Sequence, residues 1–330
     1  MQIKSFTLEK ITIPLSKPFV TAIRTATAVE SLRITLHTDT AHTAQGEAPA
    51  SALITGETLP SIEEAICTYI APAILGKPVE SDLGAVIAAS IRNNTSAKAA
   101  VEMAWQDLRA QSLSVPLYRL LGGTETPREL PNDITISAGS TDSMTESALS
   151  AISDGFAILK IKLGTNPKTD ARQLIDLYNN IKSHKILLRV DANQGWSAGE
   201  AIGIIRAWEA LPIDIIEQPT PSWDIEGLAK VKASTDLPIA ADESVFSPHD
   251  ALRVIQSRAA DVINIKLMKC GGLGPALEIC KLCEEHGLEC MVGCMLEGEV
   301  SINAARQLAA AQSVITRIDL DAPFLYKVQP

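Results

Sequence analysis

Three acidic residues each stand near the end of a short apolar run: Asp191 in ILLRVDAN, Glu217 in IDIIEQP and Asp242 in PIAADES. Carboxylates that converge inside a protein repel one another unless a proton or a cation neutralises them. Oxygen ligands that leave room for water and substrate suit Mg²⁺, with Mn²⁺ as the alternative. A single acidic residue at the end of a strand is most often a helix cap or a solvated loop residue, so this predicted metal site depends on all three residues meeting.

Two lysines, Lys160 and Lys162, lie two residues apart in LKIKLG, which reads as a buried strand, and Lys266 ends a later apolar run. Alternate residues of a strand share a face, so the first two ammonium groups lie side by side. A lone lysine in a strand usually extends to the surface, but two beside an acidic cluster indicate chemistry. A lysine with a pKa of about 10.4 is a poor base at neutral pH. We therefore expect Lys160 and a dication to lower the pKa of Lys162, which would transfer the proton.

Eight short apolar runs alternate with helical patterns after residue 126, and this alternation predicts a parallel sheet. Eight such strands most economically close into an α/β barrel, with an open doubly wound sheet as the second choice. No helical pattern follows the eighth run. The runs are DITISA, AILKIKL, ILLRVDAN, IDIIEQP, PIAADES, VINIKLM, LECMVGC and VITRIDLD.

The barrel suggests a mechanism, because the second and sixth strands are opposite in a ring of eight and chemistry occurs at the carboxyl ends of barrel strands. Lys162 and Lys266 would then face a bound substrate from opposite sides. If the substrate carboxylate binds Mg²⁺, loss of its α proton gives an enediolate whose charge the metal stabilises. One lysine takes the proton and the other returns one, which is racemisation or epimerisation.

The first 125 residues have a different organisation. Alternating segments at Ile3–Pro14 and Leu32–His37 predict an antiparallel meander, and SAKAAVEMAWQDLRAQ is the clearest of three helical stretches that follow. SIEE, from Ser61, has the spacing of a capping box that opens the first of these helices. We therefore predict a small α+β domain over residues 1–125 and the barrel over residues 126–330.

Composition limits the class of partner. The chain has 330 residues, 46% hydrophobic content and a net charge of −10. The negative charge argues against nucleic acid and against an anionic membrane surface as partners, which leaves a small-molecule substrate. No segment reads as a signal peptide or a membrane span, so we expect a cytoplasmic protein. Assembly into a homo-oligomer is left open.

Two cysteine-containing motifs are only weak evidence for a binding site. CKLC, with Cys290 and Cys294, lacks the spacing and turn chemistry of a zinc site, so buried reduced thiols are the preferred interpretation. CGGLG resembles a fragment of a phosphate-binding loop, but turn geometry explains a single glycine cluster better.

The motifs LKIKLG, VDANQGW, IEQP, ADESVF, INIKLMKCGG, MVGCMLE and DLDAPF together run over most of the chain. In them the sequence resembles the enolase superfamily, its muconate lactonizing enzyme subgroup and, within that, the dipeptide epimerases. This resemblance implies a (β/α)7β TIM-like barrel with an N-terminal α+β capping domain. It also implies that Asp191, Glu217 and Asp242 bind Mg²⁺ and that Lys162 and Lys266 are the acid/base catalysts.

The same resemblance implies a dipeptide substrate. Asp319 and Asp321 of the D-x-D motif would hold its amino terminus, and Arg24 would bind the acidic side chain of L-Ala-D/L-Glu. Lys160 and Met295 would also contact the substrate. The implied activity is an Ala-Glu epimerase that serves the reuse of cell-wall peptides.

Other activities stay open at this point. Within the family, o-succinylbenzoate synthase and muconate cycloisomerase share the barrel and metal site but need no D-x-D motif. A Schiff-base aldolase would use a barrel lysine with a depressed pKa, and a noncatalytic metal-stabilised binding protein would need none of the lysines. Two departures from the family pattern are Cys294, where relatives commonly have serine, and the short segment after Asp321, which we expect to hold the cap loosely.

Overall fold

The computed structural model describes residues 1–22, 24–124 and 126–327 and contains two sheets. The N-terminal region carries an antiparallel sheet of β1 (Ile3–Val20), β2 (Thr25–Thr38) and β3 (Thr43–Pro49). Its helical segments are α1 (Leu59–Glu64), the π-helix η1 (Ala65–Ile70), α2 (Ala71–Ile74), α3 (Leu83–Ser90), α4 (Thr95–Ser112) and α5 (Leu117–Leu120). The predicted domain boundary falls at Glu125, which lies outside the described residues. Within the described ranges, no helix combines the length and apolar character that crossing a membrane requires.

One face of this sheet packs on its helices because alternate residues of β2 are apolar. Leu32, Ile34 and Leu36 are buried in a core that also contains Val101 and Trp105 of α4. Each such burial contributes about 1.5–3 kcal/mol relative to exposure. The capping box of α1 is formed by Thr58 and Ser61, so the helix begins before the predicted SIEE segment.

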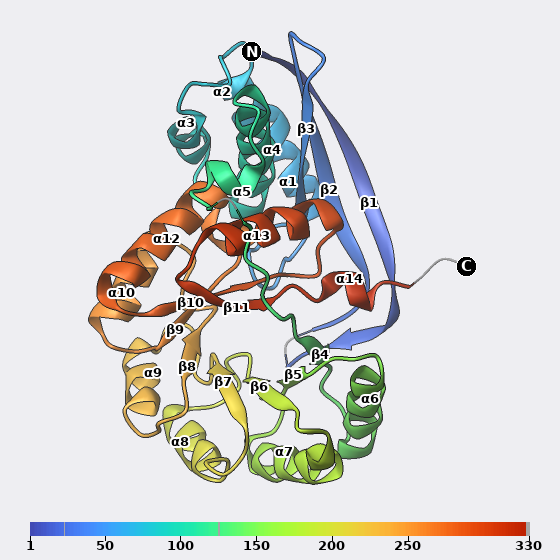
Figure 1. Cartoon of the computed structure of the whole chain (residues 1–330), viewed down its shortest axis with the longest axis vertical. Coiled ribbons are helices and arrows are strands. Elements are labelled where there is room, and N and C mark those ends of the chain that lie inside the picture. The colour runs from blue at the N-terminus through green and yellow to red at the C-terminus, as the bar shows by residue number, and fades with distance from the viewer. Residues whose placement is uncertain (23, 125, 328–330) are drawn as a thin grey trace.

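The second sheet is a barrel of eight parallel strands, and every predicted strand is present (Figure 1). The strands are β4 (Ile134–Ile136), β5 (Ile158–Lys162), β6 (Leu187–Asp191), β7 (Ile213–Glu217), β8 (Ile239–Ala241), β9 (Val262–Ile265), β10 (Glu289–Gly293) and β11 (Ile315–Asp319). A bridge between Asn132 and Ile318 joins the two end strands. Side chains reinforce this seam, because Leu320 N donates to Asn132 Oδ1 at 2.8 Å and Thr135 N donates to Asp321 Oδ2 at 2.8 Å. The open doubly wound alternative is therefore wrong.

Helices cover the outside of the barrel (Figure 1). They are α6 (Thr141–Ser153), α7 (Pro167–Ile181), α8 (Ala198–Arg206), α9 (Ile225–Lys232), α10 (Pro248–Gln256), α12 (Leu273–His286) and α13 (Glu299–Ala311), with short helices η2 (Lys182–His184) and α11 (Leu267–Cys270). Among the described residues, only the four-residue α14 (Ala322–Leu325) follows β11, which confirms the (β/α)7β pattern.

The segment after β11 returns to the N-terminal sheet. Tyr326 forms a bridge with Leu15 of β1, and Lys327 N donates to Pro14 O at 2.8 Å. Ser16 Oγ also donates to Leu325 O at 3.2 Å. The expectation that a short C-terminal segment holds the cap loosely is therefore wrong, because these few residues pair directly with β1.

Candidate active site

The carboxyl ends of the barrel strands and the tip of the β1–β2 hairpin enclose a cavity of about 50 Å³. The hairpin is fixed to the barrel through Val20, whose N donates to Ser137 Oγ at 3.2 Å and whose O accepts from Ala138 N at 3.1 Å. The structure brings all the sequence-predicted site residues to this place. Its walls include Arg24, Lys162, Asp242, Lys266, Met295, Asp319 and Asp321, and directly beneath lie Lys160, Asp191 and Glu217, each 0–1% exposed.

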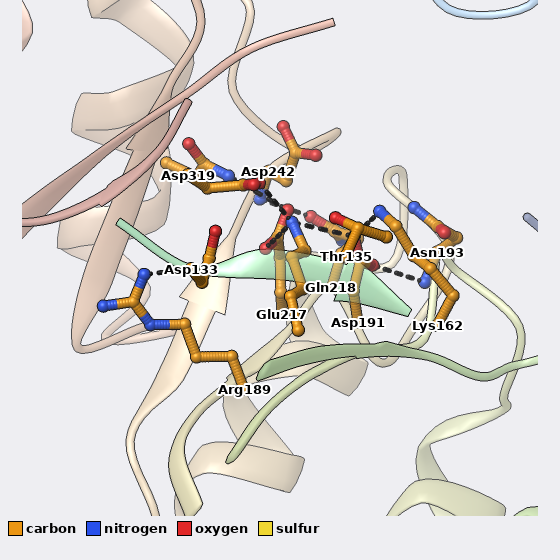
Figure 2. A network of polar contacts seen from close by, with 12 residues as sticks. Asp133, Thr135, Lys162, Arg189, Asp191, Asn193, Glu217, Gln218, Asp242 and Asp319 are labelled. Atoms are coloured by element: carbon orange, nitrogen blue, oxygen red, sulfur yellow. Dashed lines mark hydrogen bonds and ion pairs between the residues drawn. The ribbon is translucent and has the colours of Figure 1, made fainter. Parts of the chain in front are cut away.

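The three predicted metal ligands come from consecutive strands. Asp191 of β6 pairs in register with Glu217 of β7, and Asp242 follows directly after β8, the next strand. Burial raises the pKa of Glu217 to about 8, and the neighbouring carboxylates of Asp191 and Asp242 contribute to this rise. Figure 2 shows the three residues within one polar network with Lys162. Buried carboxylates this close to one another repel, so a cation bound among them stabilises the site.

Lys160 is the central counter-ion of the barrel. Its Nζ lies 2.7 Å from Glu217 Oε2, 3.2 Å from Asp191 Oδ2 and 2.6 Å from Asp319 Oδ2. Burial disfavours the charged ammonium, but the three carboxylates outweigh burial and raise the pKa of Lys160. Three carboxylates thus compensate its charge. The expected effect of Lys160 on Lys162 assumed an uncompensated positive charge, and this assumption does not hold.

The two predicted acid/base lysines enter the cavity from opposite sides of the barrel, because β5 and β9 are four strands apart in the ring. Lys162 Nζ lies 2.6 Å from Asp191 Oδ2 and 5.9 Å from the centre of the Phe19 ring. Lys266 Nζ lies 2.7 Å from Asp242 Oδ2. Burial lowers the pKa of Lys266, but the carboxylates of Asp242 and Glu217 outweigh it and the net shift is upward.

One buried cation near the metal ligands was missed in the sequence. Lys269 of α11 is 1% exposed, and its ammonium contacts Asp242 Oδ1 and lies 3.1 Å from Asn264 O. Asp242 therefore holds one lysine on each carboxylate oxygen. The available signal was the spacing in IKLMK, because Lys269 follows Lys266 by three residues, about one helical turn.

Two further oxygen atoms favour a divalent cation at this end of the barrel. Asn193 Oδ1 and Glu243 Oε2 are buried and have no hydrogen-bond partner. Asn193 lies two residues after the end of β6 and Glu243 two residues after the end of β8, and neither was a predicted site residue. An unpaired buried oxygen is costly, and oxygen donors of this kind suit Mg²⁺. Together with the carboxylates of Asp191, Glu217 and Asp242, they form a donor set that fits Mg²⁺.

A second acidic group lies at the seam between β4 and β11. Oxygen atoms of Asp133, Asp319 and Asp321 lie within 4.8 Å of one another. Arg189 Nη1 pairs with Asp133 Oδ2 at 2.8 Å, as Figure 2 shows. Burial and then Asp319 raise the pKa of Asp321 to about 6, whereas Lys160 and Lys162 outweigh burial and lower that of Asp319. Asp319 and Asp321 of this group form an anionic wall of the cavity, which suits a cationic part of a substrate.

The loop that carries Met295 is held by a buried carboxyl group, Glu297, whose Oε1 accepts from Met295 N at 2.7 Å. Burial raises the pKa of Glu297 to about 7; Glu47 adds to this rise, while Ser301, Met295 N and Lys266 oppose it. A carboxyl group with a raised pKa favours the folded state at low pH, and this contribution is lost as the pH rises through 7.

We therefore predict that Glu297→Gln reduces the pH dependence of stability. Between pH 5 and pH 8, the free energy of unfolding of the unmodified protein should fall by about 2 kcal/mol more than that of the variant. Urea unfolding at several pH values measures this difference. Equal pH dependence in the two proteins would show that Glu297 does not titrate in this range.

The barrel and its N-terminal capping domain are those of the enolase superfamily, and the chain belongs to that family. The model described as mandelate racemase/muconate lactonizing enzyme, N-terminal domain, matches residues 4–122. The model described as enolase C-terminal domain-like matches residues 143–326.

Individual relatives resemble the chain over most of its length. The L-Ala-D/L-Glu epimerase of Clostridium acetobutylicum is 46% identical, across 98% of this chain and 91% of the relative. The substrate-liganded structure of the L-Ala-D/L-Glu epimerase from Bacillus subtilis is similar with a TM-score of 0.95 and 42% identity, covering 99% of this chain and 92% of that one. The dipeptide epimerase from Enterococcus faecalis V583, complexed with Mg and L-Leu-L-Tyr, has a TM-score of 0.95 and 37% identity over 100% and 93%.

Proposed function

We propose that this protein is a Mg²⁺-dependent dipeptide epimerase that inverts the α-carbon of the C-terminal residue of L-Ala-D/L-Glu. One observation carries the proposal: Lys162 at the end of β5 and Lys266 directly after β9, two strands opposite in the ring, line one cavity. In this proposal they are the two acid/base groups, and Asp191, Glu217 and Asp242 hold the metal. Relatives named as epimerases of such dipeptides support the choice of substrate.

Proton transfer then needs only these two amines. The neutral amine of one lysine takes the α proton, so the C–H bond breaks and that lysine becomes an ammonium. The ammonium on the other side donates its proton to the opposite face of the carbon, and for the reverse reaction the two exchange roles. Bound Mg²⁺ supplies stabilisation of the negative charge that develops on the substrate carboxylate. In this proposal Lys160, beneath the cavity, acts electrostatically by neutralising the carboxylates of Asp191, Glu217 and Asp319.

The remaining cavity residues fit the two ends of such a dipeptide. Asp319 and Asp321 are buried carboxylates that suit the substrate ammonium. Arg24 of the hairpin tip presents a guanidinium, which binds a carboxylate side chain well. Met295 adds an apolar wall. We assign the activity to the reuse of cell-wall peptides in the cytoplasm, without a nucleic acid or membrane partner.

The structure supplies reasons to prefer this activity to its alternatives. Neither o-succinylbenzoate synthase nor muconate cycloisomerase needs the acidic group at the β4–β11 seam, whereas a dipeptide ammonium does. A Schiff-base aldolase, which also uses a barrel lysine, is less well supported, because the similar relatives are named as epimerases of dipeptides. A noncatalytic binding protein has no use for two amines on opposite sides of a cavity.

A screen of L,L-dipeptides in deuterated water with Mg²⁺, read by mass spectrometry, tests the proposal. We expect mass gain in L-Ala-L-Glu and in other peptides that end in Glu or Asp. In Arg24→Leu the gain with these acidic peptides should fall by roughly 10- to 150-fold, because a hydrogen bond to a charged group contributes about 1.5–3 kcal/mol.

An apolar C-terminal residue provides the matched control, because L-Ala-L-Leu does not use the guanidinium and should not lose exchange in Arg24→Leu. Gain mainly in peptides with apolar or cationic second residues would remove the role of Arg24. No gain in any dipeptide would overturn the proposed activity.

A further inference from the structure

One carboxylate of the N-terminal region reaches the start of a barrel helix. Glu102 of α4 is 3% exposed, and it accepts Leu273 N at 2.7 Å and Gly274 N at 3.0 Å. Gln106 Nε2 donates to its Oε1 at 2.8 Å. The first N–H groups of a helix have no partner within the helix, and Gly272, at the N-cap of α12, has no side chain to bind them. Glu102, a residue of the N-terminal domain, thus caps α12, a helix of the barrel.

The close approach depends on a glycine. Gly272 has φ of 131°, and a Cβ at this position would lie 2.6 Å from Glu102 Oε2. Both facts favour glycine here. They also explain the CGGLG motif, because the helix N-terminus that resembles a phosphate-binding loop is already occupied by the Glu102 carboxylate.

The capped helix is joined by a short hydrogen-bonded turn to one acid/base lysine. Cys270 N donates to Lys266 O at 3.2 Å and Lys269 N donates to Lys266 O at 2.9 Å. Gly272 N continues the turn with a bond to Leu267 O at 3.1 Å. The start of α12 is thus linked to the backbone of Lys266 by consecutive hydrogen bonds.

The opposite lysine has a different support. After Lys162, Leu163 N donates to Asp191 O at 2.9 Å and Gly164 N donates to Asp170 Oδ2 at 3.0 Å. Both acceptors belong to the barrel itself. The N-terminal domain therefore holds the backbone next to Lys266 through Glu102, whereas contacts within the barrel hold the backbone next to Lys162.

We propose that Glu102 is a positioning residue for Lys266, so that its contact with α12 keeps this amine aligned for proton transfer on one face of the substrate. The inference rests on the proposed epimerase activity. Its consequence is asymmetry, because loss of the contact impairs the proton transfers of Lys266 and leaves those of Lys162 intact. Misplacement of a reacting group by about 1 Å costs on the order of a hundredfold in rate.

Glu57 provides a matched control. It is 4% exposed and accepts Ser96 N at 2.9 Å and Ala97 N at 3.0 Å at the start of α4. Glu57 and Glu102 are therefore similarly buried, and each accepts two consecutive backbone N–H groups at the start of a helix, but the Glu57 contact lies entirely within the N-terminal domain. In either residue, glutamine keeps the shape and leaves one oxygen for two N–H groups.

The experiment measures deuterium exchange at the α-carbon for each epimer of L-Ala-D/L-Glu separately, with Mg²⁺ present. In Glu102→Gln, exchange from the epimer that Lys266 deprotonates should fall roughly tenfold to hundredfold, while exchange from the other changes by less than about twofold. Lys266→Ala identifies the sensitive epimer. Gly272→Ala, which obstructs the same contact from the barrel side, should give the same asymmetry, and Glu57→Gln should give none.

Equal losses for both epimers in Glu102→Gln and Gly272→Ala would overturn the inference, as would the same asymmetry in Glu57→Gln. Thermal unfolding of each variant shows whether it is folded at the assay temperature. The proposed epimerase activity is tested separately, in the unmodified protein. If that protein exchanges neither epimer, the epimerase activity itself is wrong.

Discussion

Epimerisation of L-Ala-D/L-Glu will be lost when either Lys162 or Lys266 is replaced by alanine, with turnover about 10³- to 10⁴-fold lower. Each inversion needs one amine to remove a proton and another to supply one from the opposite side, and these two residues line the cavity from strands on opposite sides of the barrel. Chiral chromatography of the dipeptide measures the loss directly.

The two variants should nevertheless retain complementary partial reactions. Lys162→Ala should still exchange the α proton of the epimer that faces Lys266, and Lys266→Ala should exchange only the other epimer. Lys168→Ala, an exposed lysine of α7, serves as the control and should leave turnover unchanged. Exchange of the same epimer by both variants would contradict an arrangement of one amine on each face.

The barrel could be predicted from the sequence because each strand is a short apolar run bounded by turn residues. β5, β6 and β7 are buried along nearly their whole length, which is typical of parallel strands covered on both faces. Once the strands are counted, Asp191 and Glu217 must occupy adjacent strand ends. Local spacing in the sequence was therefore enough to predict those residues of the candidate site that lie at strand ends.

Partners from distant parts of the chain could not be predicted in this way. Lys160 reads as a neighbour of Lys162, yet its contacts include Asp319, which lies 159 residues away. The contact of Glu102 with α12 spans 171 residues. Spacing shows which strand end or helix face carries a residue, but packing and competition among charges decide its partner. The same reason explains why the pairing of Tyr326 with β1 was missed.

The barrel contains two acidic groups, and we propose that only one of them binds the metal. Asp191, Glu217 and Asp242 come from consecutive strands beside the unpaired oxygens of Asn193 and Glu243. The other group, at the β4–β11 seam, has Asp133 paired with Arg189, and its remaining members face the position proposed for the substrate ammonium. We therefore propose that Mg²⁺ binds the first group, and the seam group, whose oxygen atoms lie within 4.8 Å of one another, is the alternative site that the test must separate.

Glu217→Gln should weaken Mg²⁺ binding by about a hundredfold or more, because it removes a charged ligand from a site whose affinity depends on carboxylates. Asp133→Asn is the matched control, because it also removes one negative charge from the barrel. Its Mg²⁺ affinity should stay within about twofold of that of the unmodified protein. Calorimetric titration with Mg²⁺, or relaxation measurements with Mn²⁺, gives both affinities without relying on turnover.

Removal of the metal by EDTA should abolish epimerisation, and added Mg²⁺ should restore it in the unmodified protein. Restoration in Glu217→Gln should require a much higher Mg²⁺ concentration, because the defect lies in binding. If Asp133→Asn instead weakens Mg²⁺ binding as strongly as Glu217→Gln, the ion belongs at the seam between β4 and β11. The carboxylates of Asp319 and Asp321 would then be metal ligands, and the substrate ammonium would need another partner.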